Sequence, residues 1–333
     1  MSLTINTNIS SMVAQQNLAK ATGSMNQAIE RMTTGYKINH AGDNAAGYSI
    51  ARNWETQLGS LDVAADNAAT GADMLATLED TYALVSSHIQ RIRDLTEQAA
   101  NGTYGKDSKV AIESEIKARI DEINRIAANC EFNGKKLMDG TQGAMNLQVG
   151  LYSSDDSKIN LAASLFTNST IGGLLAAYSS TTASGGVTLA NILKAANNGT
   201  AVTVSAAGIS TDAQKHALAA ACAGLVYNSS TGAFTDQTTA NCGPEQMLDF
   251  LDKVMSSIST KATTLGAAQN RVDSAIESIA VQSENITSSL STLRDADVAE
   301  ESSRYIQSQI LQQAAATLLS TANQTPSIAL NLI

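Results

Sequence analysis

The side chains that most often carry out enzymatic chemistry are few in this 333-residue chain and far apart in sequence. Its three histidines are His40, His88 and His216. A histidine can act as a general base or bind a metal, but the zinc chemistry it supports needs a spacing such as His-Glu-x-x-His. The sequence has no such motif, no phosphate-binding loop and no Gly-x-Ser-x-Gly. Gly172-Gly173 and Gly185-Gly186 are typical of flexible linkers, so we predict no catalytic site, metal or cofactor.

The cysteines Cys130, Cys222 and Cys242 are odd in number, which does not suggest a disulfide framework. Cys130 continues an apolar helical stripe and is predicted to be a small buried side chain. Cys222 and Cys242 could pair if the protein folds in an oxidising compartment, although unpaired thiols are favoured.

Charge is distributed unevenly. The net charge of −10, without a basic stripe, argues against a nucleic-acid partner. No charged side chain occurs before Lys20 or after Arg304. Glutamines and asparagines interrupt the uncharged C-terminal stretch, so no membrane-inserting run of about 20 apolar residues exists there. The N-terminus lacks the basic and apolar regions of a cleaved secretory signal, so we expect any export to use another route.

Helical periodicity dominates both halves of the chain. We predict a first helix that Thr7 or Asn8 caps and Gly35 ends, then helices over about 44–100 and 108–129. In the C-terminal half, Pro244 suits the first turn of a helix over about 245–294, and a last helix over 296–322 is expected to stop before Pro326. Seven large aliphatic residues recur at seven-residue intervals, as in a coiled coil: Leu251, Ile258, Leu265, Val272, Ile279, Ile286 and Leu293.

The middle of the chain changes character. Apolar residues alternate with polar ones over 145–151 and return at Ile159 and Leu161, which predicts a β-hairpin. Over about 166–245 only five charged residues occur, with one helix expected at 212–225 and a strand at 202–204. The fold class is therefore mainly α: a long antiparallel helical bundle or coiled coil formed by the two halves, with a hairpin and a small inserted domain of mixed structure.

Short motifs in both terminal regions resemble bacterial flagellin. They are INTN at 5–8, AIERMTTGYKIN at 28–39, DNAAG at 43–47, QRIRDL at 90–95, FNG at 132–134, QNR at 269–271, DAD at 295–297, QILQQA at 309–314 and ANQ at 322–324. The resemblance covers roughly 1–165 and 245–333. Tyr36 and Asn44 depart from the usual Leu and Asp, and cysteines are unusual in this family, but no seam residue is lost.

The resemblance implies a structural subunit that polymerises head-to-tail into the flagellar filament for swimming motility, secreted through the flagellar type III apparatus to the extracellular flagellum. Expected partners are further copies of the chain, an export chaperone on the C-terminal segment, and the filament cap and hook-junction proteins. The implied domains are an N-terminal core segment at 1–42, helical-bundle parts at 43–165 and 245–294, a variable exposed domain at 166–244, and a C-terminal core segment at 295–333.

The terminal segments also favour polymerisation on physical grounds. Each segment buries too little apolar surface to offset a chain entropy of about 1–2 kcal/mol per residue. We therefore expect both segments to be disordered in a free subunit and to become ordered when they pack against neighbouring subunits. An uncharged surface avoids the desolvation cost of a buried charge. The predicted polymerisation and core seam comprises Ile5, Ile9, Met12, Ile306, Ile310, Leu318 and Leu319 together with the seven heptad residues.

The same resemblance implies recognition by the host innate Toll-like receptor for flagellin. Members that this receptor recognises present an arginine in a Gln-Arg-x-Arg-Glu-Leu stretch and a glutamate on the next helix. Here the corresponding receptor-binding residues are Arg91, Leu95 and Glu115, with Asp94 in place of the motif's glutamate. Alternatively, these charges form ordinary surface pairs worth about 0–1 kcal/mol.

Four other classes of protein fit the sequence less well. An enzyme is disfavoured by the missing motifs. A hook-associated or filament-junction protein would share the terminal helices, but the simple hairpin and compact insert favour the bulk subunit. An adhesin or secreted effector would place its function in 166–245. An ordinary soluble coiled coil would not need uncharged ends or these terminal motifs.

Overall fold

The computed structural model describes residues 8–176, 188–197, 209, 211–236 and 243–330, with side chains described as far as Gln324 in the last of these ranges. The chain forms two compact units. Unit 1 comprises Met1–Asp62 and Ala280–Ile333, and unit 2 comprises Val63–Ile279. Helices α2 (Ala45–Ala100) and α7 (Pro244–Arg294) contribute residues to both units.

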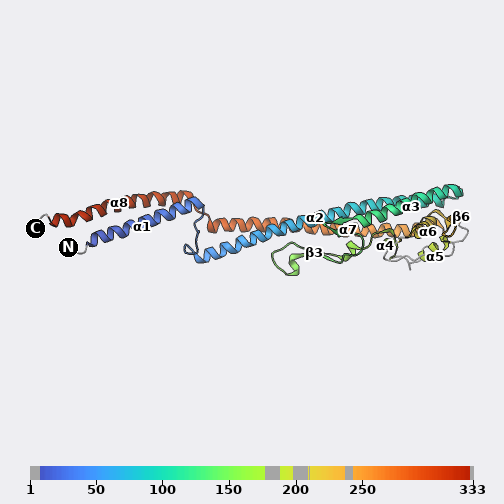
Figure 1. Cartoon of the computed structure of the whole chain (residues 1–333), viewed down its shortest axis with the longest axis horizontal. Helices are drawn as coiled ribbons and strands as arrows, with labels where there is room; N and C mark the ends of the chain where they lie inside the picture. The colour runs from blue at the N-terminus through green and yellow to red at the C-terminus, as the bar shows by residue number, and fades with distance from the viewer. Residues whose placement is uncertain (1–7, 177–187, 198–208, 210, 237–242, 331–333) are drawn as a thin grey trace. The chain divides into compact units, whose positions relative to one another are not determined.

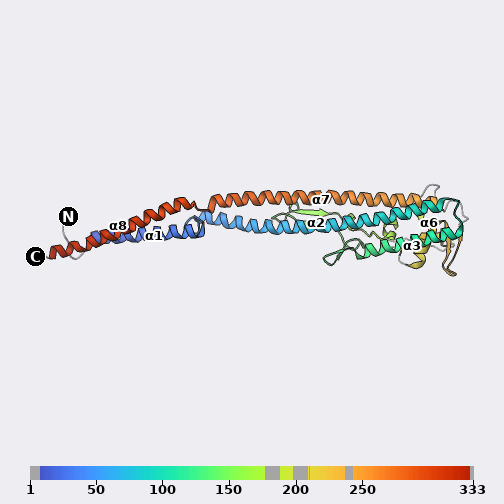
Figure 2. The same ribbon diagram turned by 90° about the horizontal axis from the view of Figure 1, so that it is seen from above.

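In unit 1, helix α1 (Ile9–Thr34) runs antiparallel beside helix α8 (Val298–Leu330) (Figures 1 and 2). The Asn8 side chain caps α1 by accepting a hydrogen bond from the Ser11 N–H at 3.1 Å. Gly35 ends the helix at φ 77°, a left-handed conformation that glycine adopts without steric cost, and its N–H donates to the Arg31 carbonyl. The structure thus selects Asn8 over Thr7, which lies outside the described residues, and confirms the predicted end.

The predicted stop of the last helix before Pro326 is wrong, because α8 continues to Leu330. A proline has no N–H to donate to the carbonyl four residues earlier, which here belongs to Ala322. That carbonyl accepts a hydrogen bond from Nδ2 of Asn8 at 2.7 Å.

Unit 2 is built around α2, α3 (Lys106–Asn129) and α7, which lie side by side (Figures 1 and 2). On the inner face of α2, apolar residues recur every three or four positions, and those from Leu75 through Tyr82 and Ile89 to Ala99 are at most 2 % exposed. On α3, Ile116, Ile120 and Ile123 are fully buried. Arg93 of α2 pairs with Asp252 of α7, with Nε and Oδ1 2.5 Å apart.

Two antiparallel hairpins follow α3. Strands β1 (Glu131–Phe132) and β2 (Lys135–Lys136) meet at Asn133 and Gly134, whose φ angles of 49° and 76° suit a tight turn. Strands β3 (Met145–Gln148) and β4 (Lys158–Leu161) pair with Met145 opposite Leu161 and Leu147 opposite Ile159, and the 3₁₀ turn η1 (Asp155–Ser157) precedes β4. The predicted hairpin is confirmed, and with the long helices it confirms the mainly α fold class.

The inserted segment contains more regular structure than its sequence indicated. The helix predicted over 212–225 is α6 (Asp212–Ala223), which packs on α3 and is at most 2 % exposed from Ala217 to Ala223. The unpredicted elements are η2 (Ala163–Phe166), α4 (Ile171–Ala176), α5 (Leu189–Ala196), β5 (Leu225–Asn228) and β6 (Ala233–Asp236). Their apolar side chains join the hydrophobic core of α3 and α7. The strand expected at 202–204 lies outside the described residues.

Two of the cysteines are buried thiols. Cys130 is 7 % exposed, as predicted, and its Sγ lies 3.6 Å from Oγ1 of Thr81. Cys222 is 1 % exposed, and burial raises its pKa to about 12, so it carries no thiolate at neutral pH. Cys222 is a free thiol in this structure, so the conditional pairing with Cys242 is not formed, and Cys242 itself lies outside the described residues.

A half-buried lysine in unit 2 makes stability depend on pH. Nζ of Lys261 lies 2.6 Å from Oγ1 of Thr167, 3.3 Å from Oγ of Ser169 and 5.6 Å from the centre of the Tyr82 ring. Burial lowers its pKa from 10.5 to about 8. The unfolded chain therefore binds more protons between these two values, and the cost of the buried ammonium is present below about pH 8 and fades as the pH rises.

We expect Lys261→Met to raise the free energy of unfolding of unit 2 at pH 7 by on the order of 1–2 kcal/mol, because it removes that buried charge. By pH 10.5 the gain should have largely disappeared. Urea unfolding of the full chain at both values measures it, with Lys106→Met at an exposed position as the control. A gain that is equal at both pH values would contradict the assignment.

Candidate functional site

Small side chains form the contact between α1 and α8. The buried positions recur every seven residues on each helix, as in a coiled-coil seam. They are Ala14, Ala21 and Ala28 on α1, and Glu301, Ser308 and Ala315 on α8. Except for Glu301, these are alanines and a serine, which let the helices approach closely but remove little apolar area from water, at about 25 cal/mol per Å². The pairing within one chain is therefore weak for its length.

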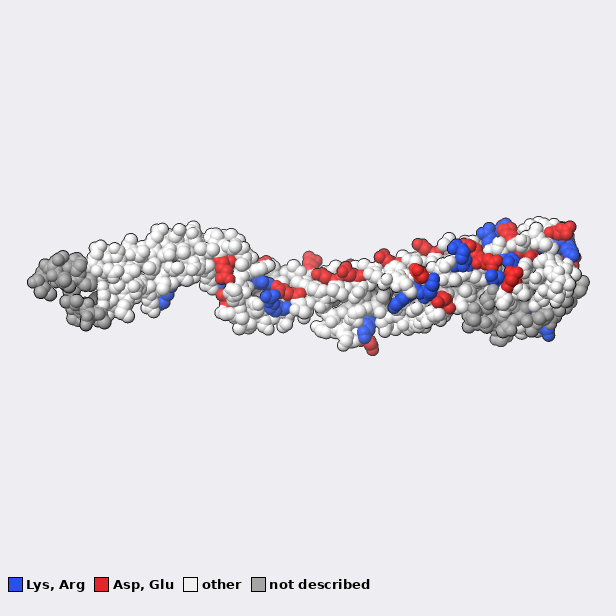
Figure 3. All heavy atoms as spheres, in the orientation of Figure 1, with Lys and Arg blue, Asp and Glu red and all other residues white. Residues whose placement is uncertain are grey.

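The polar contacts across this pair are neutral along most of its length. Nε2 of Gln312 donates to Oγ1 of Thr22 at 3.2 Å, and Oγ of Ser11 lies 2.7 Å from Oδ1 of Asn323. Apart from Lys20, α1 carries no charged residue before Glu30, and α8 carries none after Arg304. In the view of Figure 3, the α1–α8 pair accordingly shows almost no charged atoms.

The large aliphatic side chains of the same helices point to solvent. We call the exposed set the terminal apolar surface: Ile9, Met12 and Val13 at 51–68 % exposure on α1, and Ile306, Ile310, Leu311 and Leu318 at 53–62 % on α8. A groove of about 510 Å³ between Ile9, Val13 and Leu318 lies within it. Contiguous exposed apolar surface of this kind marks an interaction site.

The residues of the predicted seam fall into separate groups. Ile9, Met12, Ile306, Ile310 and Leu318 belong to the terminal apolar surface, whereas Ile286, Leu293 and Leu319 are half-buried. By contrast, Leu251, Ile258, Leu265, Val272 and Ile279 are at most 5 % exposed and form core within unit 2. Ile5 lies outside the described residues. The surface available to another molecule is thus the terminal one.

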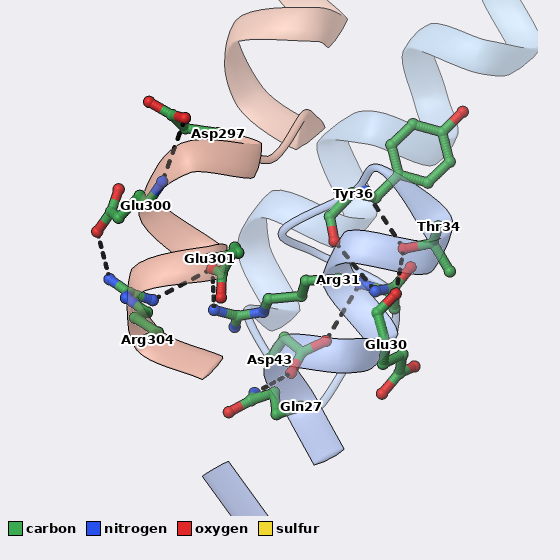
Figure 4. Close-up of polar contacts among 11 residues, drawn as sticks. Gln27, Glu30, Arg31, Thr34, Tyr36, Asp43, Asp297, Glu300, Glu301 and Arg304 are labelled. Carbon is green, nitrogen blue, oxygen red and sulfur yellow. Dashed lines mark hydrogen bonds and ion pairs between the residues drawn. The ribbon is translucent and has the colours of Figure 1, made fainter. Parts of the chain in front are cut away.

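An ion-pair cluster joins the C-terminal end of α1 to the first turns of α8 (Figure 4). Nη1 of Arg31 lies 3.1 Å from Oε1 of Glu301, and their side chains are only 17 % and 6 % exposed. Nη1 of Arg304 lies 3.3 Å from the same Glu301 oxygen, and Nη2 of Arg304 lies 2.7 Å from Oε1 of Glu300. Sequence reasoning missed this cluster, although its members mark the ends of the nearly uncharged stretches.

The loop after α1 is held by Asp43. Its carboxylate accepts hydrogen bonds from the N–H groups of His40 and Asn39 and from Nε2 of Gln27, the last shown in Figure 4. The backbone hydrogen bond from His40 is the main cause that lowers the Asp43 pKa. In the loop, Tyr36 forms an isolated antiparallel β-bridge with Asp295, and the Arg294 guanidinium lies 4.0 Å from the Tyr36 ring centre. These contacts fix the connection between α1 and α2.

Two of the three predicted receptor-binding residues form one surface feature in unit 2. Nε of Arg91 donates to Oε1 of Glu115 at 2.9 Å, and their side chains are 48 % and 37 % exposed. Nη2 of Arg119 lies 3.7 Å from the same Glu115 oxygen. Leu95 is 2 % exposed and packs in the core. Of the three predicted residues, only the charged pair is therefore accessible to a partner.

The histidines lie at separate places. Nδ1 of His216 is 2.8 Å from Oε1 of the buried Glu113, and its ring stacks on Tyr227. His40 pairs with Glu30, and His88 lies beside Arg119. Among the described residues, no three potential metal ligands gather, and none of the helices combines the length and apolar character needed to cross a membrane.

Comparison with known proteins gives consistent results. The family model for the bacterial flagellin N-terminal helical region matches residues 5–143, and that for the C-terminal helical region matches residues 248–333. Polar flagellin F of Vibrio parahaemolyticus is 30 % identical, and flagellin A of Vibrio anguillarum is 32 % identical, each over the full length of both chains.

Solved structures were compared as well. A Bacillus cereus flagellin structure aligns with 64 % of this chain and 88 % of its own, at 19 % identity and a TM-score of 0.38. FliC from Burkholderia pseudomallei aligns with 60 % of this chain and 99 % of its own, at 20 % identity and the same TM-score.

Glu301→Gln should weaken the α1–α8 pair strongly, because it leaves the largely buried guanidinium of Arg31 without its carboxylate. Losing one partner of a buried pair costs about 3–5 kcal/mol, whereas exposed pairs contribute about 0–1 kcal/mol. The matched control is Glu300→Gln, whose side chain is 61 % exposed. Hydrogen exchange of the α1 and α8 amides in polymers of the full chain measures both variants. Equal effects would show that the pair's burial does not matter.

Proposed function

This chain belongs to the bacterial flagellin family, and from that premise we propose that the terminal apolar surface carries the contacts between its subunits. Family membership makes the protein a structural subunit of the flagellar filament, which serves motility. The observation that carries the proposal is the outward exposure of the large aliphatic side chains of α1 and α8, including Ile9, Ile310 and Leu318.

Burial of this surface against a neighbouring subunit supplies what the α1–α8 pair lacks by itself. Fully burying one large aliphatic side chain stabilises by roughly 1.5–3 kcal/mol. The exposed residues of the surface can therefore offset the ordering of the terminal segments only after they meet another copy. Because charges are nearly absent there, that burial carries little desolvation cost, and amide and hydroxyl side chains can pair across the contact.

From this we infer that α1 and α8 are largely disordered in a free subunit and fold on assembly. As the flagellin resemblance implies, we propose that subunits add head-to-tail through a heterologous contact, which builds an open helix. We propose the domain division given above: core segments at 1–42 and 295–333, bundle parts at 43–165 and 245–294, and an outward-facing domain at 166–244.

The flagellin resemblance also supports the remaining partners. We propose export of the unfolded chain by the type III apparatus, a chaperone that holds the uncharged C-terminal segment before export, and extracellular assembly beneath the cap on hook-junction proteins. The chaperone would cover an apolar segment that is exposed until assembly, which is consistent with the exposure of Leu311 and Leu318.

Ile310→Ser should raise the lowest concentration at which the chain elongates filament seeds by roughly 30-fold, since it removes about 2 kcal/mol of burial. Circular dichroism of the free subunit should change little, because α8 is largely disordered there on the proposed function and Ile310 is 60 % exposed even when the helix is formed. Sedimentation of seeded polymer measures the effect. Gln307→Ser on an exposed position of the same helix is the control. Normal elongation by Ile310→Ser would remove the surface from the assembly contact.

A second function is favoured by the exposed charged pair. We propose that Arg91 and Glu115 form part of a ligand surface for the host Toll-like receptor for flagellin. Their side chains come from neighbouring helices and remain accessible while paired to each other. Leu95, buried beneath them, would act by holding the helix in place and not by direct contact.

Arg91→Ala is expected to weaken binding of the soluble receptor ectodomain to the monomer by about tenfold or more, as for a central arginine at an interface. Arg125→Ala is the matched control, because Arg125 is 62 % exposed and also pairs with a glutamate, Glu122, but lies outside the motif. Surface plasmon resonance compares the two variants. Equal affinities would end the assignment.

A further inference from the structure

Lys20 is an isolated charge on the outer face of α1. It follows Ile9 by eleven residues and Val13 by seven, so the three side chains share one helix face, and all three are exposed. The ion pairs of α1 that the structure describes belong to Glu30 and Arg31, near its C-terminal end. Glu30 is ten residues, or about 15 Å, further along the helix than Lys20.

The facing part of α8 offers Lys20 no carboxylate either. Gln312 donates to Thr22 across the pair, which places Lys20 near this level of α8. No charged residue follows Arg304, and Arg304 precedes Gln312 by eight residues, or about 12 Å. Burial of the terminal apolar surface would therefore strip water from an ammonium that has no counter-charge within its own helix pair. Such burial is strongly unfavourable unless a neighbouring subunit supplies a carboxylate.

Unit 1 contains a pocket whose charge matches this requirement. The pocket has a volume of about 770 Å³ and lies between the loop after α1, the last turns of α7 and the first turns of α8. Four acidic and three basic side chains line it, and the acidic ones are labelled in Figure 4. Ile38 and Trp54 also line it and suit the methylene stem of a lysine. The pocket thus lacks one positive charge.

Glu300 is the acidic residue of this pocket that is most open to a new partner. Asp43 already accepts three hydrogen bonds in the loop, and Asp297 accepts from an N–H of the first turn of α8 at 2.8 Å. The side chain of Glu301 is only 6 % exposed. By contrast, the side chain of Glu300 is 61 % exposed, and it pairs with Arg304, which is itself 51 % exposed.

The wall of the pocket also contains polar atoms without partners. Oε2 of Glu301 is buried and accepts no hydrogen bond from a described residue, and Nε of Arg31 likewise donates to none. Both side chains line the pocket. A buried acceptor without a donor is destabilising, so a donor that enters the pocket would be favoured. An ammonium has three N–H donors, enough for Glu300 and for this oxygen.

We propose that Lys20 of one subunit enters this pocket of the next copy and pairs there with Glu300. The proposal rests on the proposed function, because assembly is what buries the face of α1 that carries Lys20. The lysine and the pocket lie at different places on the same chain, so each copy gives its lysine to one neighbour and receives that of another. Such a contact is heterologous, as an open helical polymer requires.

Charge exchange between two variants of the full chain tests the proposal. Lys20→Glu brings two carboxylates together at the contact, and Glu300→Lys brings two ammonium groups together. Each variant alone should raise the lowest concentration that elongates wild-type filament seeds by roughly 30-fold or more. An equimolar mixture should elongate them within about fivefold of the wild-type concentration, because the two variants can alternate and each supplies the charge that the other lacks. Rescue by mixing requires a contact between copies, since a contact within one chain would stay mismatched.

Lys106→Glu is the matched control, because Lys106 is an exposed lysine in unit 2. Mixed with Glu300→Lys, it should give no rescue. Normal elongation by Lys20→Glu, as expected if the lysine stays in water after assembly, would overturn the proposal. A mixture that fails to recover, or equal recovery with Lys106→Glu, would overturn it as well. Ile310→Ser reports on the terminal apolar surface separately, so any of these results would leave the proposed function standing.

Discussion

The small-residue seam between α1 and α8 is the constraint on which the rest of unit 1 depends. Alanine and serine at the buried positions bring the helices close together, and the larger side chains are consequently displaced to the outside. Ile9 and Met12 on one helix and Ile310 and Leu318 on the other are more than half exposed. The helical order of the two segments therefore gains little from the chain itself, and their remaining apolar surface is available to another copy.

Unit 2 follows the opposite rule. Its heptad aliphatics, such as Leu265 and Val272, are buried inside the subunit beside the stripe of α2 and the isoleucines of α3. Regular structure from the inserted segment adds α6 to the same core. Unit 2 can thus fold without a neighbour, whereas the paired termini cannot be expected to. On the proposed function, this difference would let a chain stay monomeric until it meets the growing filament, since assembly is coupled to the ordering of the termini.

Much of this arrangement could be predicted from the sequence. Caps and breakers indicated the ends of α1, the heptads indicated α7, and alternation indicated the β3–β4 hairpin. Periodicity could not show that Ile258 faces a core while Ile310 faces solvent, because both lie on helices with similar spacing. That outcome depends on the neighbouring helix. The side chains that pack around Ile258 are large, whereas those at the contact between α1 and α8 are small. The short elements α5, β5 and β6 were missed because tertiary burial stabilises them more than local pattern does.

Two polar contacts of unit 1 are not anticipated by local rules. By those rules Asn8 only caps its own helix, and Arg31 and Glu301 are ordinary surface charges. In each case a partner more than 250 residues away completes the interaction. The Asn8 amide supplies a donor to the Ala322 carbonyl, and Glu301 supplies a carboxylate to a largely buried guanidinium. Both contacts are polar, directional and placed at opposite ends of a seam that is otherwise uniform. Along such a seam, dispersion and apolar burial give affinity without a preferred register, so register has to come from hydrogen bonds and charge.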